Sequence, residues 1–76
     1  MKRLDRITFV PNVMGGKATI RGMRVTVGMV VGLVASGYSF AKILEEYPYL
    51  EEEDIRQALE YAAWRASEIE VPTGTE

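Results

Sequence analysis

The chain has 76 residues and a formal net charge of −2, and it contains neither cysteine nor histidine. That length allows a single domain. Without those two residue types there can be no disulfide scaffold, no thiol nucleophile, no Ser–His–Asp triad and no metal site built on them. We therefore expect a protein that is not an enzyme and that holds no metal and no cofactor. The longest nearly apolar run, residues 25–35, is too short to cross a bilayer, which predicts a cytoplasmic protein without a membrane partner.

Charge is distributed unevenly along the chain. Residues 1–36 carry six basic side chains and one acidic one, whereas residues 37–76 carry three basic and ten acidic ones, so the two parts have net charges of +5 and −7. Such asymmetry occurs in proteins that bind nucleic acid or a charged partner. It is also compatible with two solvated faces, and with identical chains that meet through faces of opposite sign.

Two short β segments are expected before residue 26. Residues 6–10 are rich in β-branched and aromatic side chains and predict a first strand. Residues 18–25 alternate on either side of Gly22, which predicts a tight hairpin or a kinked strand with a positive φ at that glycine. We expect the side chains of Ile20 and Val25 to point inward. Those of Arg21 and Arg24 should point outward.

The segment 27–36 is ambiguous, because valine favours strands and glycine weakens helices. Its valines, however, recur at i, i+3, i+4 and i+7, which is helical spacing. Thr26 can cap the amino end, and Gly37 stands where a glycine commonly follows a helix. Together these features predict a first helix.

Two further helices follow. A helix capped by Ser39 is expected to end before Pro48, and another to run from near Glu51 to near Glu68 with acids in its first turn. The sequence thus predicts a mostly α fold, with short N-terminal β-strands or a hairpin followed by a three-helix bundle. We expect one domain over residues 1–68, made of a β segment or arm (1–25) and a three-helix core (26–68), and a flexible tail over residues 69–76. The predicted core consists of Ile7, Ile20, Val25, Val27, Val30, Val31, Val34, Ile43, Leu44, Tyr47, Leu50, Ile55, Leu59 and Ala62.

Three motifs that occur in order carry a resemblance to a known family. Residues 16–27, GKATIRGMRVTV, resemble a signature of the form GGKPxIRGTRIPV; residues 43–50, ILEEYPYL, resemble IleeyPxL; and residues 53–63, EDIRQALEYAA, resemble eDIraALayAa. The chain therefore resembles the bacterial and archaeal domain-of-unknown-function family 433, whose members are often described as VapB-type antitoxin-like. Ala18, Met23 and Glu51 depart from the residues that are common in that family.

The resemblance implies a small helical fold with a helix-turn-helix-like, homeodomain-like core behind an N-terminal β segment. It also implies a link to toxin–antitoxin operons, in which antitoxins commonly dimerise, bind their own promoter and mask a nuclease toxin of the PIN-domain kind. The expected function is a non-enzymatic, antitoxin-like binding module that neutralises a co-encoded toxin. The alternative is a stand-alone DNA-binding transcriptional regulator.

A conventional DNA recognition helix is not expected. In a helix-turn-helix the second helix enters the major groove by its amino-terminal residues. Here those residues would be the four acids at positions 51–54, which repel phosphates. Contacts to operator DNA are instead expected from Arg3, Arg6, Lys17, Arg21 and Arg24. The alternative is that Arg21 and Arg24 are structural and pair with the acidic half of the chain.

The surface expected to bind the toxin is the acidic half of the chain, because a nuclease face that handles phosphates tends to be basic. Aromatic residues near its end can serve as anchors in an interface. The expected residues are Glu52, Glu53, Glu60, Tyr61 and Trp64. For Trp64, packing against the domain's own core is the alternative.

A homodimer seam is expected on the first predicted helix. Residues 27–36 carry no charge, and their small residues recur every four positions, so another backbone could approach that face closely. The expected interface residues are Gly28, Gly32, Leu33 and Ser36. The alternative is close packing of this face within the monomer.

Overall fold

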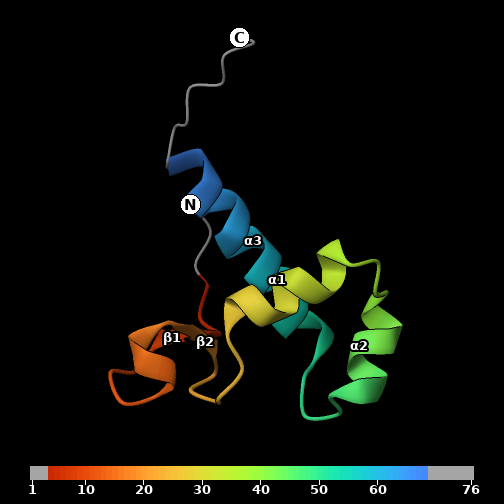
Figure 1. Cartoon of the computed structure of the whole chain (residues 1–76), viewed down its shortest axis with the longest axis horizontal. Helices are drawn as coiled ribbons and strands as arrows, with labels where there is room; N and C mark the ends of the chain where they lie inside the picture. The colour runs from red at the N-terminus through yellow and green to blue at the C-terminus, as the bar shows by residue number, and fades with distance from the viewer. Residues whose placement is uncertain (1–3, 69–76) are drawn as a thin grey trace, which may run out of the picture.

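A computed structural model describes residues 4–68 of the chain. Its elements, in order, are β1 (Ile7–Phe9), the 3-10 turn η1 (Met14–Gly16), β2 (Ala18–Ile20), α1 (Val27–Ala35), α2 (Phe40–Glu46) and α3 (Glu52–Glu68). Figure 1 shows α1 crossing α3, with the two strands on one side of that crossing and α2 on the other. The expectation of a mostly α fold with short N-terminal strands is confirmed. Arg3 and the tail 69–76 lie outside the described residues.

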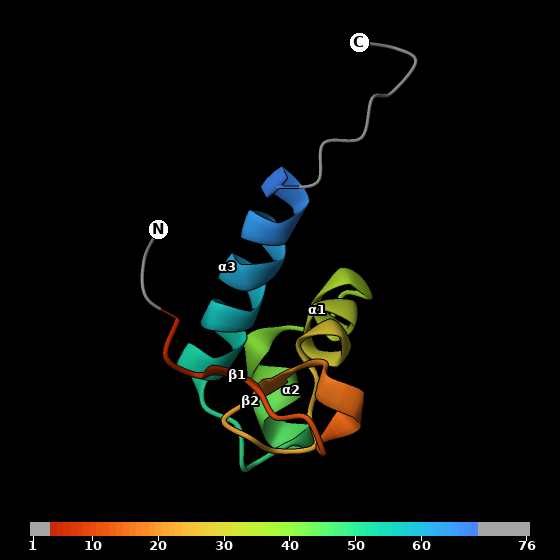
Figure 2. The ribbon, with the colours of Figure 1, turned by 90° about the vertical axis from the view of Figure 1, so that its left-hand side faces the viewer.

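β1 and β2 form a two-stranded antiparallel sheet, in which Ile7 pairs with Ile20, Thr8 with Thr19 and Phe9 with Ala18. The Thr8 and Thr19 hydroxyls lie 2.9 Å apart and hydrogen-bond across the pair. Seen from the side in Figure 2, β1 passes close to the N-terminal part of α3. The sheet therefore connects the start of the chain to its last helix.

The chain reverses at residues 21–24, as the glycine there predicts. Arg21 and Gly22 both have positive φ, at 48° and 71°, and the Ile20 N–H donates to the Val25 carbonyl at 2.9 Å. The reversal is a turn rather than a second β-hairpin, because beyond it only Thr26 forms a bridge, with Thr19. The strand partner of β2 is therefore β1, which the sequence pattern did not predict.

The helices begin where the polar caps predict. The Thr26 hydroxyl accepts a hydrogen bond from the Met29 N–H at the start of α1, and the Ser39 hydroxyl accepts one from the Lys42 N–H at the start of α2. Gly37, with φ of 98°, follows Ser36, the C-cap residue of α1, and turns the chain away from the helix. These side-chain bonds satisfy amide groups that have no partner within the helix.

The core lies where β2, α1, α2 and the first half of α3 meet. Its buried apolar side chains are Ile20, Val25, Val27, Val30, Ile43, Leu50, Ile55 and Ala58. The predicted Ala62 is only half-buried and lines a groove, while Ala58, one helical turn earlier, occupies the core. Of α1, which has no charged residue, only Val27 and Val30 are fully buried. Among the described residues, no helix is long and apolar enough to span a membrane.

Candidate functional site

An ion-pair cluster joins Arg6, Arg21, Glu51 and Asp54, and we call it the Asp54 cluster. Asp54 lies in the first turn of α3, and its side chain is completely buried. Arg21 binds it through both carboxylate oxygens, with Nε–Oδ1 at 3.0 Å and Nη2–Oδ2 at 2.8 Å. Arg6 Nη1 contacts the same carboxylate at 3.1 Å and Glu51 Oε1 at 2.6 Å. The cluster thus joins both ends of the β segment to α3.

Asp54 also acts as a helix cap. Its Oδ2 accepts a hydrogen bond of 2.8 Å from the backbone N–H of Glu51, the residue before α3. Burial acts to raise the pKa of Asp54, but the hydrogen bonds from Arg21, the Glu51 amide and Arg6 outweigh it and hold that pKa below its ordinary value. The carboxylate is therefore ionised near neutral pH and fully bonded.

Gln57 adds a second connection between α3 and the β segment. Its Oε1 accepts from the Arg6 backbone N–H at 2.9 Å, and its Nε2 donates to Asp5 at 3.1 Å and to Glu53 at 2.9 Å. The Arg21 N–H donates to the Arg6 carbonyl at 2.8 Å. Backbone and side chains together fix the position of the two arginines.

The structure separates the residues expected to contact DNA. Arg6 and Arg21 are held in the Asp54 cluster, which is the structural role considered as the alternative for Arg21. Lys17 and Arg24 are exposed, and neither forms an ion pair with another residue of the described range. The four of these residues that the structure describes, Arg6, Lys17, Arg21 and Arg24, therefore do not all offer free charge to DNA.

Three aromatic rings form a cluster on the surface where β1 meets the second half of α3. The ring centroids of Phe9 and Tyr61 are 5.9 Å apart, and those of Tyr61 and Trp64 are 6.0 Å apart. Both distances fall within the favourable range for aromatic pairs. Phe9 is 59% exposed and Trp64 is 37% exposed, so much of the cluster faces solvent. We call Phe9, Tyr61 and Trp64 the aromatic cluster.

The acids expected to bind a toxin lie along α3 and differ in their surroundings. Glu52 is exposed, whereas Glu53 bonds to Arg56 at 3.1 Å and to Gln57. Glu60 is half-buried, and its Oε1 is shielded from solvent without a hydrogen-bond partner in the described part of the chain. Glu53, Glu60 and Trp64 are spaced by seven and four residues, so they share one side of the helix.

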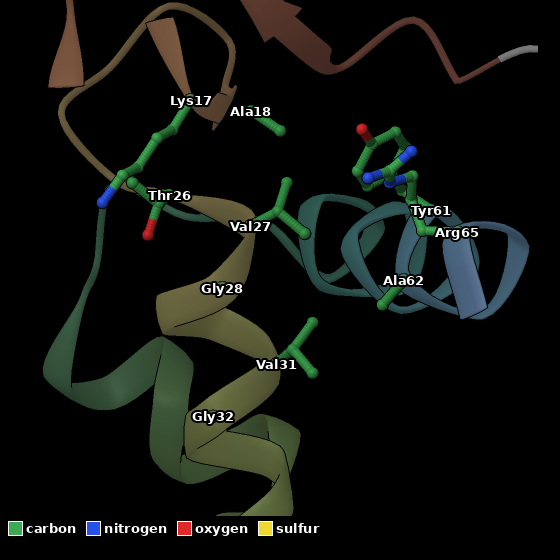
Figure 3. A pocket seen from close by; sticks show the side chains of 10 residues that line it. All are labelled: Lys17, Ala18, Thr26, Val27, Gly28, Val31, Gly32, Tyr61, Ala62 and Arg65. Carbon is green, nitrogen blue, oxygen red and sulfur yellow. The ribbon is translucent and has the colours of Figure 1, made fainter. Parts of the chain in front are cut away.

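A groove of about 560 Å³ lies between α1 and α3. In Figure 3, Val27 and Val31 point from α1 toward the α3 side chains. The lining residues are Lys17, Ala18, Thr26, Val27, Gly28, Val31, Gly32, Tyr61, Ala62 and Arg65. Two of the expected dimer residues, Gly28 and Gly32, are exposed in this groove. The other two differ: Leu33 packs partly against the monomer's own core, and Ser36 is the exposed residue that ends α1.

Sequence reasoning missed two of the features described above. The sequence predicts Phe9 only as part of a strand. Residues two apart in a strand share a face, so its spacing from the inward-packed Ile7 would place it inward, yet Phe9 is largely exposed. Asp54 was grouped with three neighbouring acids, but helical rotation turns it inward while Glu52 stays exposed. Within residues 4–68 no three acids come together in a way that could hold a metal ion.

A family model and a solved structure both point to one family. The model of the family "Protein of unknown function (DUF433)" matches residues 7–62. An uncharacterized protein of Sinorhizobium fredii, y4eO, is 43% identical over 56 residues, which are 74% of this chain and 25% of that protein. A crystal structure of a DUF433 member from Anabaena variabilis superposes with a TM-score of 0.75 at 32% identity, over 83% of this chain and 62% of that one. The chain thus spans a quarter of the length of the curated relative.

Proposed function

Since the chain belongs to the DUF433 family, we propose that it is a non-enzymatic, antitoxin-like binding module that neutralises a co-encoded nuclease toxin of the PIN-domain kind. The proposed toxin-binding surface is the side of α3 that carries the aromatic cluster and Glu60. It includes Tyr61 and Trp64, which the sequence had suggested, and adds Phe9 from β1.

The observation that carries this proposal is the exposure of the aromatic cluster. Exposed apolar patches on small domains commonly mark interaction surfaces, and tryptophan and tyrosine are favoured anchors in protein interfaces. The rings come from two elements and pack on one another, so they are already held in place before a partner binds. Such ordering reduces the entropy lost on association.

The surroundings of Glu60 favour a partner that carries basic residues. The Glu60 side chain is half-buried, and its Oε1 has no hydrogen-bond partner within the described residues, which is unfavourable; if the side chain turns outward, a lysine or arginine of another protein would stabilise its carboxylate. A surface that handles the phosphates of a nucleic acid carries such residues. The aromatic cluster would supply contact area, and Glu60 would supply charge recognition beside it.

The stand-alone DNA-binding regulator is the less well supported candidate. Two of the arginines expected to contact DNA, Arg6 and Arg21, form ion pairs with Asp54 and Glu51, so they offer less net charge to phosphates. Lys17 and Arg24 are the described basic residues of the β segment that could still contact DNA. Binding to the chain's own promoter would then be a further activity of the toxin-binding module.

The test is co-expression of the full chain with the product of the reading frame that neighbours its gene, followed by co-purification and a nuclease assay. We expect Trp64→Ala to weaken the complex by about 30-fold, the effect of losing an interface hot spot of about 2 kcal/mol. Tyr49→Ala is the matched control, because Tyr49 is 51% exposed and its ring contacts Tyr47, away from the aromatic cluster. Equal toxin inhibition by both variants and the parent would refute the proposed surface.

A second comparison tests the charge. Glu60→Gln should weaken toxin binding, and Glu45→Gln, at an exposed position on α2, should leave it unchanged. If no nuclease is bound but promoter DNA is, with an affinity that falls steeply as salt rises, the regulator is the better assignment.

A further inference from the structure

The aromatic cluster presents ring surface of a kind that attracts cations. Its two ring pairs meet at interplanar angles of 61° and 42°, so neither pair is stacked face to face. Phe9 and Trp64 are both exposed, so part of their ring surface reaches solvent. The face of an aromatic ring is electrostatically negative, most strongly in tryptophan, and it attracts an ammonium or guanidinium within about 6 Å of the ring centre. The cluster can therefore receive a cation as well as an apolar side chain.

The position of Glu60 distinguishes between these two ligands. This residue lies one helical turn before Trp64 and next to Tyr61, and its half-buried side chain has an oxygen without a hydrogen-bond partner within residues 4–68. An apolar ligand over the rings would remove more water from this carboxylate and replace none of it. A cation would contact the rings and, once the Glu60 side chain turns outward, would also bond to its carboxylate. The combination of rings and carboxylate therefore favours a cation.

We propose that the aromatic cluster and Glu60 form a receptor for one arginine side chain on the surface of the partner; the inference rests on the proposed function, which makes the nuclease toxin the source of that arginine. Arginine fits better than lysine, because its guanidinium is planar, stacks on aromatic faces and is less strongly hydrated than an ammonium. Its donors lie in the plane of the group, so a guanidinium stacked on Trp64 can donate to Glu60 at its edge. Arginine is also a preferred contact to the phosphates of a nucleic acid, so the receptor would cover a residue that the nuclease uses for its substrate.

Arg65 allows a test of the sign of the ligand's charge. It is exposed, lies one turn after Tyr61, and forms no ion pair with another residue of the described range. Its charge repels a cation bound on the neighbouring rings and attracts an anion. Arg65→Gln should therefore tighten the binding of a cation by about twofold, and it would weaken the binding of an anion.

The first experiment titrates the full chain with N-acetylarginine amide and follows the indole N–H by NMR. The chain has one tryptophan, so this signal reports on Trp64 alone. We expect a shift that saturates in the millimolar range with this probe and not with N-acetylcitrulline amide, its uncharged analogue of similar shape. Glu60→Gln should raise the dissociation constant about two- to threefold, whereas Glu45→Gln, at an exposed position on α2, should leave it unchanged.

Three results of this titration would overturn the proposal. They are equal responses to the arginine and citrulline probes, an unchanged dissociation constant in Glu60→Gln, and weaker binding of the arginine probe by Arg65→Gln. All three concern the arginine probe alone and do not depend on whether a nuclease is bound.

The second experiment replaces Trp64 by 5-fluorotryptophan and then by 5,7-difluorotryptophan, which alters no other residue because the chain has a single tryptophan. Fluorine draws electron density from the ring face with little change of shape, so the affinity for the nuclease should fall stepwise, by about two- to fivefold in total. An affinity that stays constant or rises would overturn the arginine receptor and leave toxin binding intact. Saturable binding of the arginine probe by a chain that binds no nuclease would support the receptor and overturn the proposed function.

Discussion

Replacing Asp54 by asparagine should destabilise the domain more than any other change that preserves side-chain size. The buried carboxylate accepts four hydrogen bonds, two from Arg21 and one each from Arg6 and the Glu51 amide. Asparagine keeps one acceptor oxygen and turns an NH₂ group toward two of the four donors, whichever way its amide is oriented. About half of the bonds are lost, and the remaining ones are no longer between opposite charges.

The expected loss in the free energy of unfolding of Asp54→Asn is about 2–4 kcal/mol. Hydrogen bonds to charged groups contribute about 1.5–3 kcal/mol each, and the partly exposed arginines recover some of that from water. A chain of this length is expected to be stable by only about 4–11 kcal/mol, so the change is a large fraction of the total. In a domain of this size each kcal/mol shifts Tm by about 4–8 °C.

Urea denaturation followed by circular dichroism measures this loss, with Glu52→Gln as the control. Glu52 lies in the same first turn of α3 but is exposed, so its variant should stay within about 0.5 kcal/mol of the parent. An Asp54→Asn variant as stable as the control would show that the cluster does not hold the β segment on α3, and the reasoning above would be wrong.

Three further predictions concern the same fold. The pKa of Asp54 is lower in the folded than in the unfolded chain, so the stability that its carboxylate contributes should be present above the unfolded pKa of about 3.9 and be lost as the pH falls through the folded pKa. The free energies of unfolding of the parent and Asp54→Asn, measured by urea denaturation, should therefore converge below about pH 5. Thr26→Ala removes the cap of α1 and should cost about 1 kcal/mol in urea denaturation, and an unchanged midpoint would contradict the cap's role. Gly37→Ala, at φ of 98°, should lower the free energy of unfolding by about 0.5–1 kcal/mol, whereas Gly32→Ala, inside α1, should raise it by a similar amount; a change of the same sign in both variants would refute the different backbone roles of the two glycines.

The helices could be predicted because their signals are local. A hydroxyl at Thr26 or Ser39 bonds an amide three residues later, and Pro48 acts on the residue before it. The spacing of valines in α1 also indicates the side of the helix that faces the core, although only Val27 and Val30 of the four are fully buried. These features need no knowledge of the rest of the chain, and the structure has them where the sequence indicates.

The pairing of β1 with β2 and the Asp54 cluster could not be predicted in the same way. Arg21 and Asp54 are separated by 33 residues, and Arg6 and Asp54 by 48. The cap bond of Asp54 to the Glu51 amide is local, but nothing local identifies Arg6 and Arg21 as its partners. Its role follows only from the direction that α3 takes relative to the β segment, which is set by the packing of the core.

The charge asymmetry of the sequence acquires a structural meaning from this arrangement. Within the described residues, Arg6 and Arg21 of the basic first part meet Glu51 and Asp54 of the acidic second part, at the junction of the β segment and α3. Opposite charge on the two halves therefore helps to hold the domain together. The net charge of each half overstates the charge that is available to a partner. A binding surface must be sought among the groups that this pairing leaves over: Glu60, with an unbonded oxygen beside the aromatic cluster, and Lys17 and Arg65 at the rim of the groove. These two sets carry opposite charge, and Tyr61 belongs both to the aromatic cluster and to the lining of the groove, so the two candidate surfaces adjoin on the second half of α3 and a ligand at one of them would meet the charge of the other.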